Sequence, residues 1–161
     1  EDPKILQWRF VVDCPDARHI VLCENLNFLK TPRIARDNHI ELWYVGGNNI
    51  SNIDYIPDHK LTLPLYYSCD WDYDGLKIYE RLQDRFARKS KSITLLYPSP
   101  ILRKSVDSPE HNSRWKHDQP FSGLIRSAYS QEAISLIQDL IAQDEWVEEE
   151  TCELIEMVKL T

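Results

Sequence analysis

The sequence has no apolar run that approaches the roughly 18 residues of a membrane-spanning helix. It also has no signal-peptide pattern, no internal repeat and no low-complexity segment. These absences favour a protein that acts in the cytoplasm without a membrane. Because the chain opens at Glu1 and not at a methionine, we expect it to be part of a larger protein.

Cysteine is sparse and never occurs as a C-x-x-C pair. Cys23 and Cys69 end apolar runs, and Cys14 and Cys152 are isolated. Such positions suit buried thiols in a reducing compartment. We therefore expect neither a disulfide framework nor a structural zinc site.

Length and composition indicate one globular domain. The 161 residues are 42% apolar and 28% charged, which suffices for a proper core. The net charge of −7 is unevenly divided: residues 1–76 carry −5, residues 77–126 carry +6 and residues 127–161 carry −8. A basic middle segment beside an acidic site suits a phosphate backbone, and it suits a solvated surface equally well.

The hydrophobic pattern predicts an α/β fold with a mostly parallel four-stranded sheet flanked by helices. Short apolar runs alternate with helical segments, and a carboxy-terminal helical extension follows. We expect a lead-in strand at 5–12, four strands near 19–24, 40–45, 63–68 and 92–97, a short helix at 50–56, a helix at 76–88, and two acidic helices built on Ala133–Ile141 and Val147–Val158. Glu148, Glu149 and Glu150 are interpreted as a solvated face.

Three aspartates directly follow the third predicted strand. Asp70, Asp72 and Asp74 occupy alternate positions before Gly75. One of them would suffice as a helix cap, but three carboxylates so close together repel one another, and a hard cation relieves that repulsion. An EF-hand loop is excluded, because its twelfth position is Arg81 where a bidentate Glu is needed, and a strand precedes it.

An acid also follows the first predicted strand. Glu24 is 46 positions from Asp70, yet the carboxyl ends of parallel strands meet at one sheet edge, so the two residues can lie close together. A capping role for Glu24 stays open. Gly46 and Gly47 close the second strand, where they permit a sharp turn, close backbone approach or a phosphate cradle.

Basic residues gather on the predicted helix and in the segment that follows the fourth strand. Lys77, Arg81, Arg85 and Arg88 form a stripe on the helix, which fits either partner binding or ordinary solvation. Residues 101–129 are polar, basic and partly aromatic, as in binding loops. The histidines of this segment, His111 and His117, match no metal motif and are expected to be exposed.

The order of these acids resembles the Toprim domain, the metal-binding module of topoisomerases, primases and several nucleases. Glu24 matches the acid after the family's first strand, and Asp70 and Asp72 match its D-x-D motif. The likeness is greatest to the carboxy-terminal Toprim domain of the nuclease subunit in Wadjet-type plasmid-defence systems and to the topoisomerase VI A subunit. It divides the chain into a lead-in segment (1–19), a Toprim core (20–100) and an extension of the same domain (101–161).

The resemblance implies a DNA endonuclease that uses Mg²⁺ or Mn²⁺ and serves in plasmid or phage defence. Asp70 and Asp72 would hold the metal, Asp74 would be an additional or water-mediated ligand, and Glu24 would be a ligand or the general acid/base. The residues expected to follow the backbone of double-stranded DNA are Lys77, Arg81, Arg85, Arg103, Lys104 and Arg114. A double-strand cut implies a homodimer, and the Wadjet likeness adds a complex with an SMC-like ATPase.

Three other functions fit parts of the pattern. A Toprim fold can dock DNA or a partner with its carboxylates holding only a structural ion. A topoisomerase component is also possible, but none of the eight tyrosines stands in a recognisable nucleophile context. A phosphatase with an aspartyl nucleophile is disfavoured, because its D-x-D motif belongs on the first strand.

Overall fold

The computed structural model describes residues 10–47 and 49–161. Its main sheet has five strands: β1 (Val11–Val12), β2 (His19–Cys23), β3 (Ile40–Tyr44), β4 (Leu65–Ser68) and β5 (Thr94–Leu95). Their spatial order is β1-β3-β2-β4-β5. All neighbouring strands are parallel except β1 and β3, so the mostly parallel sheet is confirmed.

The fifth strand is the antiparallel lead-in β1, which the four-stranded prediction left outside the sheet. Val11 pairs with Trp43 and Val12 with Leu42. The rest of the expected lead-in strand, residues 5–9, lies outside the described residues, while Phe10 is described and its carbonyl accepts from Tyr44 N. The predicted fourth strand is shortened to the two residues of β5.

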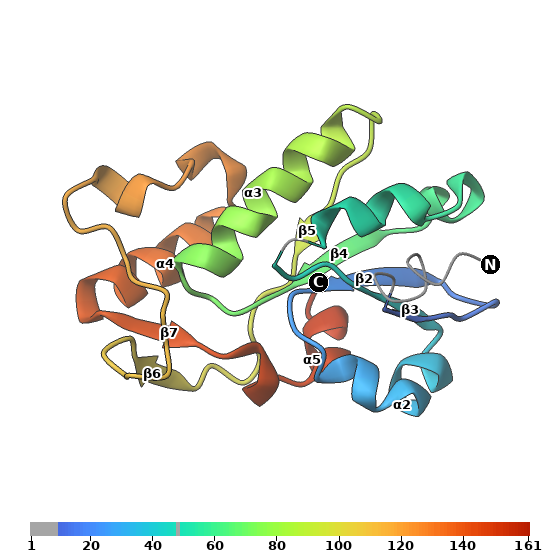
Figure 1. The fold of residues 1–161 in the computed structure, drawn as a ribbon, viewed down its shortest axis with the longest axis horizontal. Coiled ribbons are helices and arrows are strands. Elements are labelled where there is room, and N and C mark those ends of the chain that lie inside the picture. Colours follow the sequence, from blue (N-terminus) through green and yellow to red (C-terminus); the bar gives the residue numbers. More distant parts are fainter. Residues whose placement is uncertain (1–9, 48) are drawn as a thin grey trace.

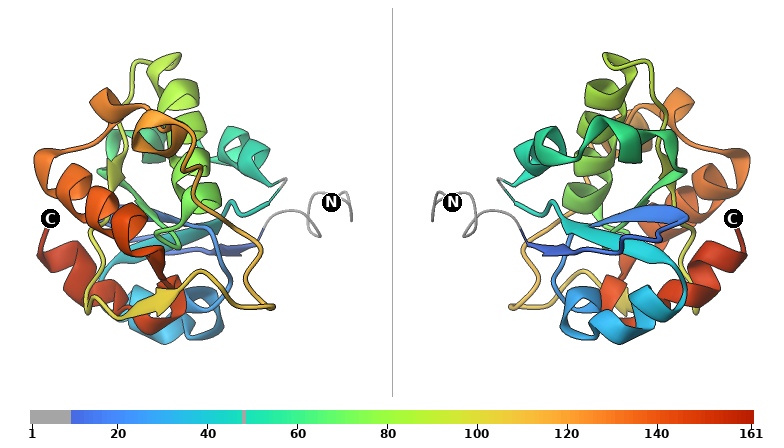
Figure 2. Two further views of the ribbon diagram at one scale, coloured as in Figure 1. Left: turned by 90° about the vertical axis from the view of Figure 1, so that its left-hand side faces the viewer. Right: turned by 90° about the vertical axis from the view of Figure 1, so that its right-hand side faces the viewer.

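Helices cover both faces of the sheet (Figures 1 and 2). On one face lie α3 (Tyr73–Ala87) and the 3-10 segments η2 (Ile50–Tyr55) and η3 (Asp58–Thr62). On the other lie α2 (Pro32–Asp37), preceded by η1 (Phe28–Lys30), and α5 (Leu154–Lys159). The apolar stripe predicted for α3 is confirmed as its buried face, which includes Leu76, Tyr79, Leu82 and Phe86.

The carboxy-terminal part differs from the prediction. Helix α4 (Gln131–Gln143) matches the first expected helix, but the second does not begin at Val147. Instead, β7 (Glu145–Val147) pairs with β6 (Arg103–Ser105), the turn η6 (Glu149–Thr151) follows, and only then does α5 begin. Val147 also bridges to Trp71, so pairing between distant segments replaces the helical turn that the apolar spacing favours.

Two short 3-10 turns, η4 (Pro120–Gly123) and η5 (Arg126–Ala128), lie in the long segment before α4. Tyr129, at the end of η5, is buried, and its hydroxyl donates to Glu80 on α3 at 2.6 Å. This contact anchors the long segment against the helix. The four cysteines are buried and free; burial was predicted for Cys23 and Cys69, which end apolar runs. Within residues 10–47 and 49–161, no helix is long and apolar enough to cross a bilayer.

Candidate metal centre

Glu24 and the aspartates lie at the carboxyl ends of two adjacent strands, as predicted. Strands β2 and β4 are parallel with Cys23 opposite Ser68, so the residues that follow them leave the same sheet edge. Glu24 N donates to Ser68 O at 2.9 Å. The Oε1 atom of Glu24 then accepts from Asp70 N at 2.8 Å, across 46 positions of sequence.

Two glycines allow this close approach. A Cβ at Gly46 would lie 1.8 Å from the carbonyl oxygen of Glu24, and one at Gly75 would lie 2.1 Å from that of Asp70 and 2.8 Å from Glu24 Oε1. Real Cβ contacts are never this short, so any side chain here would displace the acids. Of the three roles left open for Gly46, close backbone approach is the one that the structure shows.

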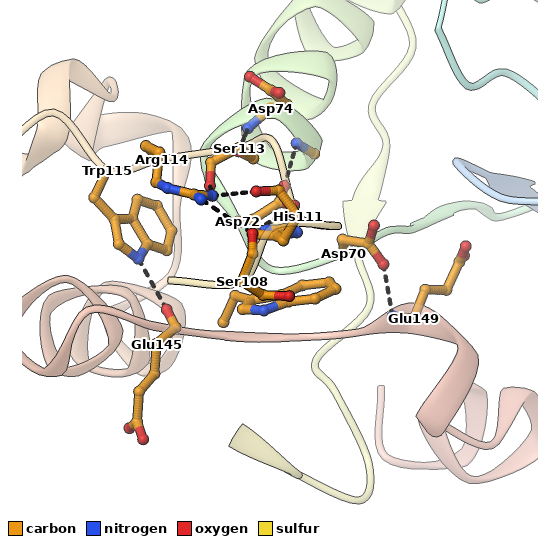
Figure 3. Close-up of polar contacts among 12 residues, drawn as sticks. Asp70, Asp72, Asp74, Ser108, His111, Ser113, Arg114, Trp115, Glu145 and Glu149 are labelled. Carbon is orange, nitrogen blue, oxygen red and sulfur yellow. Dashed lines mark hydrogen bonds and ion pairs between the residues drawn. The ribbon is translucent and has the colours of Figure 1, made fainter. Parts of the chain in front are cut away.

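A fourth acid completes the group and was not predicted. Glu149 is fully buried, although the sequence was interpreted as placing it on a solvated face; that interpretation was wrong for this residue. Its backbone N–H donates to Asp70 Oδ1 at 2.8 Å (Figure 3). Its Oε1 atom accepts from Asn25 N at 2.9 Å. Glu150 is exposed, as the pattern predicted.

The position of Glu149 follows from strand β7. Val147 N and O exchange backbone hydrogen bonds with Trp71, at 3.3 and 2.8 Å, which brings the chain beside the aspartates. A signal was present in the sequence, because the apolar pair Trp146–Val147 precedes an acidic run just as apolar strands precede Glu24 and Asp70.

The four carboxylates share one arrangement: each has one oxygen that accepts a backbone N–H. The donors to Glu24, Asp70, Asp72 and Glu149 are respectively the N–H groups of Asp70, Glu149, Gly75 and Asn25. The bonds to Glu24, Asp70 and Glu149 join three chain segments into a ring, which we call the carboxylate ring. Among the described residues, the second oxygens accept no hydrogen bond of normal geometry, although Asp72 Oδ2 lies 3.5 Å from His111 Nε2 and the side chains of Ser68 and Asn25 act on Glu149.

Burial and mutual repulsion make these carboxyls weak acids. Burial, helped by the charges of Asp70 and Asp72, raises the pKa of Glu24 to about 9. Burial and the charge of Asp70 raise the pKa of Asp72 to about 8. Burial likewise raises the pKa of Glu149 to about 8, although Ser68 and Asn25 oppose the change. Burial also raises the pKa of Asp70, against the effect of the N–H of Glu149.

The donor set suits a hard divalent cation. Carboxylate oxygens are the ligands that Mg²⁺ prefers, and a cation would relieve the repulsion that raises these pKa values. Glu149 Oε2 is a buried oxygen without a hydrogen-bond partner. Buried polar atoms are nearly always paired, so this oxygen is a candidate metal ligand. Among the described residues, no group of three His, Cys, Asp or Glu side chains stands in an arrangement that could hold a metal ion.

Asp72 and Asp74 differ in their surroundings. Asp72 is buried and caps α3, its Oδ1 accepting from Gly75 N at 2.8 Å, so the capping role and the acidic site coincide in one residue. Asp74 lies in the first turn of α3 and is exposed. Its backbone N–H donates to Ser113 Oγ at 3.0 Å (Figure 3), and its carboxylate takes no part in the carboxylate ring.

His111 lies over the site, contrary to the expectation that it is exposed. Its Nε2 atom is 3.5 Å from Asp72 Oδ2, and its side chain is only 10% exposed. The imidazole stacks on Trp146 with ring centroids 3.7 Å apart. Burial and the charge of Arg114 lower its pKa. His117 is exposed, as expected, and pairs with Asp144.

Five of the six residues predicted to bind DNA already have partners within the protein. Four are in ion pairs: Lys77 with Glu80, Arg85 with Asp54, Arg103 with Asp139, and Lys104 with Glu148. Arg114 donates to loop carbonyls, including Ser108 O at 3.2 Å (Figure 3). Arg81 is exposed and has no ion pair or hydrogen bond among the described residues.

The stripe on α3 borders a groove of about 600 Å³. Lys77, Arg81, Arg85 and Arg88 line it together with Glu80, Asp84 and the apolar residues Ile50 and Ile125. Its charge is therefore mixed, although cations outnumber acids.

Comparison of the chain with protein-family models, with curated proteins and with solved structures finds no match.

Proposed function

We propose that the chain is a Toprim-like nuclease domain that binds Mg²⁺ or Mn²⁺ and cleaves DNA phosphodiesters. The observation that carries the proposal is the meeting of Glu24, Asp70 and Asp72 at the shared edge of β2 and β4, each with one carboxylate oxygen held and the other available. This is the order of acids on which the Toprim resemblance rests, brought together in space.

Asp70 and Asp72 would hold the cation, with Glu24 as a further ligand. Bound there, a divalent cation supplies charge that polarises a phosphoryl oxygen and stabilises the leaving oxygen. Asp74 has an exposed carboxylate, so its contribution would be an additional ligand or one mediated by water.

The chain's own residues supply the surroundings of the reaction. The fixed orientation of Glu24, set by Asp70 N, suits it to accept or hold a proton near the phosphate. His111 and Trp146 stack beside Asp72, and the two rings would limit access of water to this side of the site. Arg114 acts electrostatically on His111 and Lys104 on Asp70, so both cations are near enough to the acids to attract a phosphate.

Double-stranded DNA is the proposed substrate because the cations lead away from the acidic edge along α3, where the groove contains Lys77, Arg81 and Arg85. One acidic site cuts one strand, so a double-strand cut would need a homodimer. We also propose that the chain is part of a larger plasmid- or phage-defence protein, and that this protein works in a complex with an SMC-like ATPase.

Plasmid cleavage tests the function. Supercoiled plasmid is incubated with Mg²⁺ or Mn²⁺ and either the chain or any longer protein that contains it. We expect nicking or linearisation that depends on the metal and is lost in an Asp70→Asn/Asp72→Asn variant. A matched Asp37→Asn variant, altered at an exposed residue of α2, should cleave like the wild type.

The other outcomes separate the competing functions. Metal binding and DNA binding without cleavage would contradict the nuclease and support a docking module that holds a structural ion. If neither cleavage nor metal binding occurs, the acids serve as caps and the proposal is wrong.

A further inference from the structure

We propose that Glu149, delivered by the carboxy-terminal segment, is a ligand of the same cation as Asp70. The inference rests on the proposed function in one respect, namely that a cation binds at this edge of the sheet. It adds a residue outside the Glu and D-x-D motifs and makes the carboxy-terminal extension part of the site.

The first argument is the geometry around Asp70. Glu149 N donates to Asp70 Oδ1 at 2.8 Å, so the two residues are in direct contact (Figure 3). Asn25 N fixes the Oε1 atom of Glu149 at 2.9 Å. Asn25, the residue after Glu24, thus positions the Glu149 carboxylate, while the backbone N–H of Glu149 positions the Asp70 carboxylate.

The second argument is the oxygen that has no partner. Glu149 Oε2 belongs to a residue that is inaccessible to solvent and accepts no hydrogen bond of normal geometry, and the Ser68 hydroxyl that stabilises this carboxylate is itself without a hydrogen-bond partner. Burying an ionisable group without pairing it is unfavourable. If the residue served only to accept from the Asn25 N–H and from the side chains of Ser68 and Asn25, a neutral amide would do so without burying a charge. A cation ligand gives the second oxygen a function.

The third argument is the contrast with the neighbouring acids. Glu148 pairs with Lys104 at 2.6 Å near the surface, and Glu150 is exposed. Of the three consecutive glutamates, Glu149 alone turns inward, because the bridge between Val147 and Trp71 fixes the direction of the chain. Glu150 therefore provides a control of identical chemistry one residue away.

The test compares Glu149→Gln with Glu150→Gln in two measurements. Titration calorimetry measures the affinity for Mn²⁺, and thermal unfolding with and without Mn²⁺ measures stability. Gln keeps an oxygen for Asn25 N but removes the charge. We expect Glu149→Gln to bind Mn²⁺ about tenfold more weakly or worse, while its metal-free melting temperature is unchanged or higher. Glu150→Gln should bind like the wild type.

A structural role would give the reverse pattern, a lower metal-free melting temperature with unchanged affinity, and would overturn the inference. If Glu149→Gln does not fold, Glu149→Asp retains the charge but withdraws it by one methylene. A ligand role predicts weaker binding for that variant too, and unchanged binding would contradict it.

The two proposals fail in different ways. If the wild type binds no Mn²⁺, the metal site itself is wrong. If the wild type binds Mn²⁺ through Asp70 and Asp72 while Glu149→Gln binds it equally well, only the role of Glu149 is wrong.

Discussion

Glu24 turns its carboxylate toward the backbone of Asp70, whose N–H lies 2.8 Å from Glu24 Oε1. The side chain of Glu24 thus fixes the position of the Asp70 backbone. Burial, together with the charges of Asp70 and Asp72, raises the pKa of Glu24 to about 9, although the N–H of Asp70 opposes this change. The pH dependence of the metal-free protein follows from this arrangement.

We predict that stability without metal falls as the pH rises. From the ordinary value of 4.5 to about 9, folded Glu24 keeps a proton that the unfolded chain has released, so the unfolded state binds fewer protons. The free energy of unfolding must then decrease across this window. Because one pKa unit corresponds to about 1.4 kcal/mol, we expect Glu24, Asp72 and Glu149 together to give a loss of several kcal/mol or more between pH 5 and pH 9.

Denaturant unfolding in the presence of a chelator, at several pH values, measures this loss. Asp72→Asn keeps a capping oxygen and removes a charge, so it should flatten the dependence, whereas Asp74→Asn in the same turn should not. Stability that rises from pH 5 to pH 9 in the wild type would refute the assignment of raised pKa values.

The glycines that border the site should resist substitution. In Gly75→Ala the new Cβ would meet Asp70 O at 2.1 Å, and in Gly46→Ala it would meet Glu24 O at 1.8 Å. Each backbone must shift, so we expect losses of roughly 3 kcal/mol in the free energy of unfolding together with weaker metal binding. Gly47→Ala is the control, because a Cβ at Gly47 would meet no other atom. Its φ of +60° still strains any residue with a side chain, and we expect that strain alone to cost about 1 kcal/mol.

Arg81 should contribute more to DNA binding than Arg85, although both lie on α3. Arg85 is paired with Asp54 at 2.8 Å, whereas Arg81 is exposed and unpaired among the described residues. We expect Arg81→Ala to weaken binding of a labelled duplex and to reduce the slope of log K against log salt by about 0.9. Fluorescence anisotropy over a range of salt concentrations measures both. Equal effects of Arg81→Ala and Arg85→Ala would show that the internal ion pair does not limit Arg85.

The buried carboxylate of Glu41, on β3, should depend on Lys60 for its stability. Glu41 has no exposed surface, and its Oε1 atom lies 2.5 Å from Lys60 Nζ. Cys14 N and Trp43 Nε1 also donate to this carboxylate. Lys60→Met would leave a buried charge without its cation, and because these other donors remain we expect a loss of about 3 kcal/mol. Glu41→Gln/Lys60→Met should recover part of it in the same denaturant titration, and no recovery would argue against the ion pair.

The predicted part of the site depended on local pattern and one rule of topology. Glu24, Asp70 and Asp72 follow apolar strands, and parallel strands necessarily bring those positions to one edge. Glu149 and His111 could not be found in this way. The burial of Glu149 depends on pairing between Val147 and Trp71, and that of His111 depends on stacking with Trp146, contacts that no local periodicity encodes.

The carboxylate ring couples assembly of the site to docking of the segment that carries β7 and Glu149. Its hydrogen bonds span 46, 79 and 124 positions and unite the first, middle and last parts of the sequence. A nascent chain has no such ring until Glu149 has been synthesised and β7 has docked. Because contacts so distant in sequence form late in folding, the acids can be brought together only after the sheet and its extension are in place. If the chain cleaves DNA as proposed, cleavage would therefore begin only after β7 has docked.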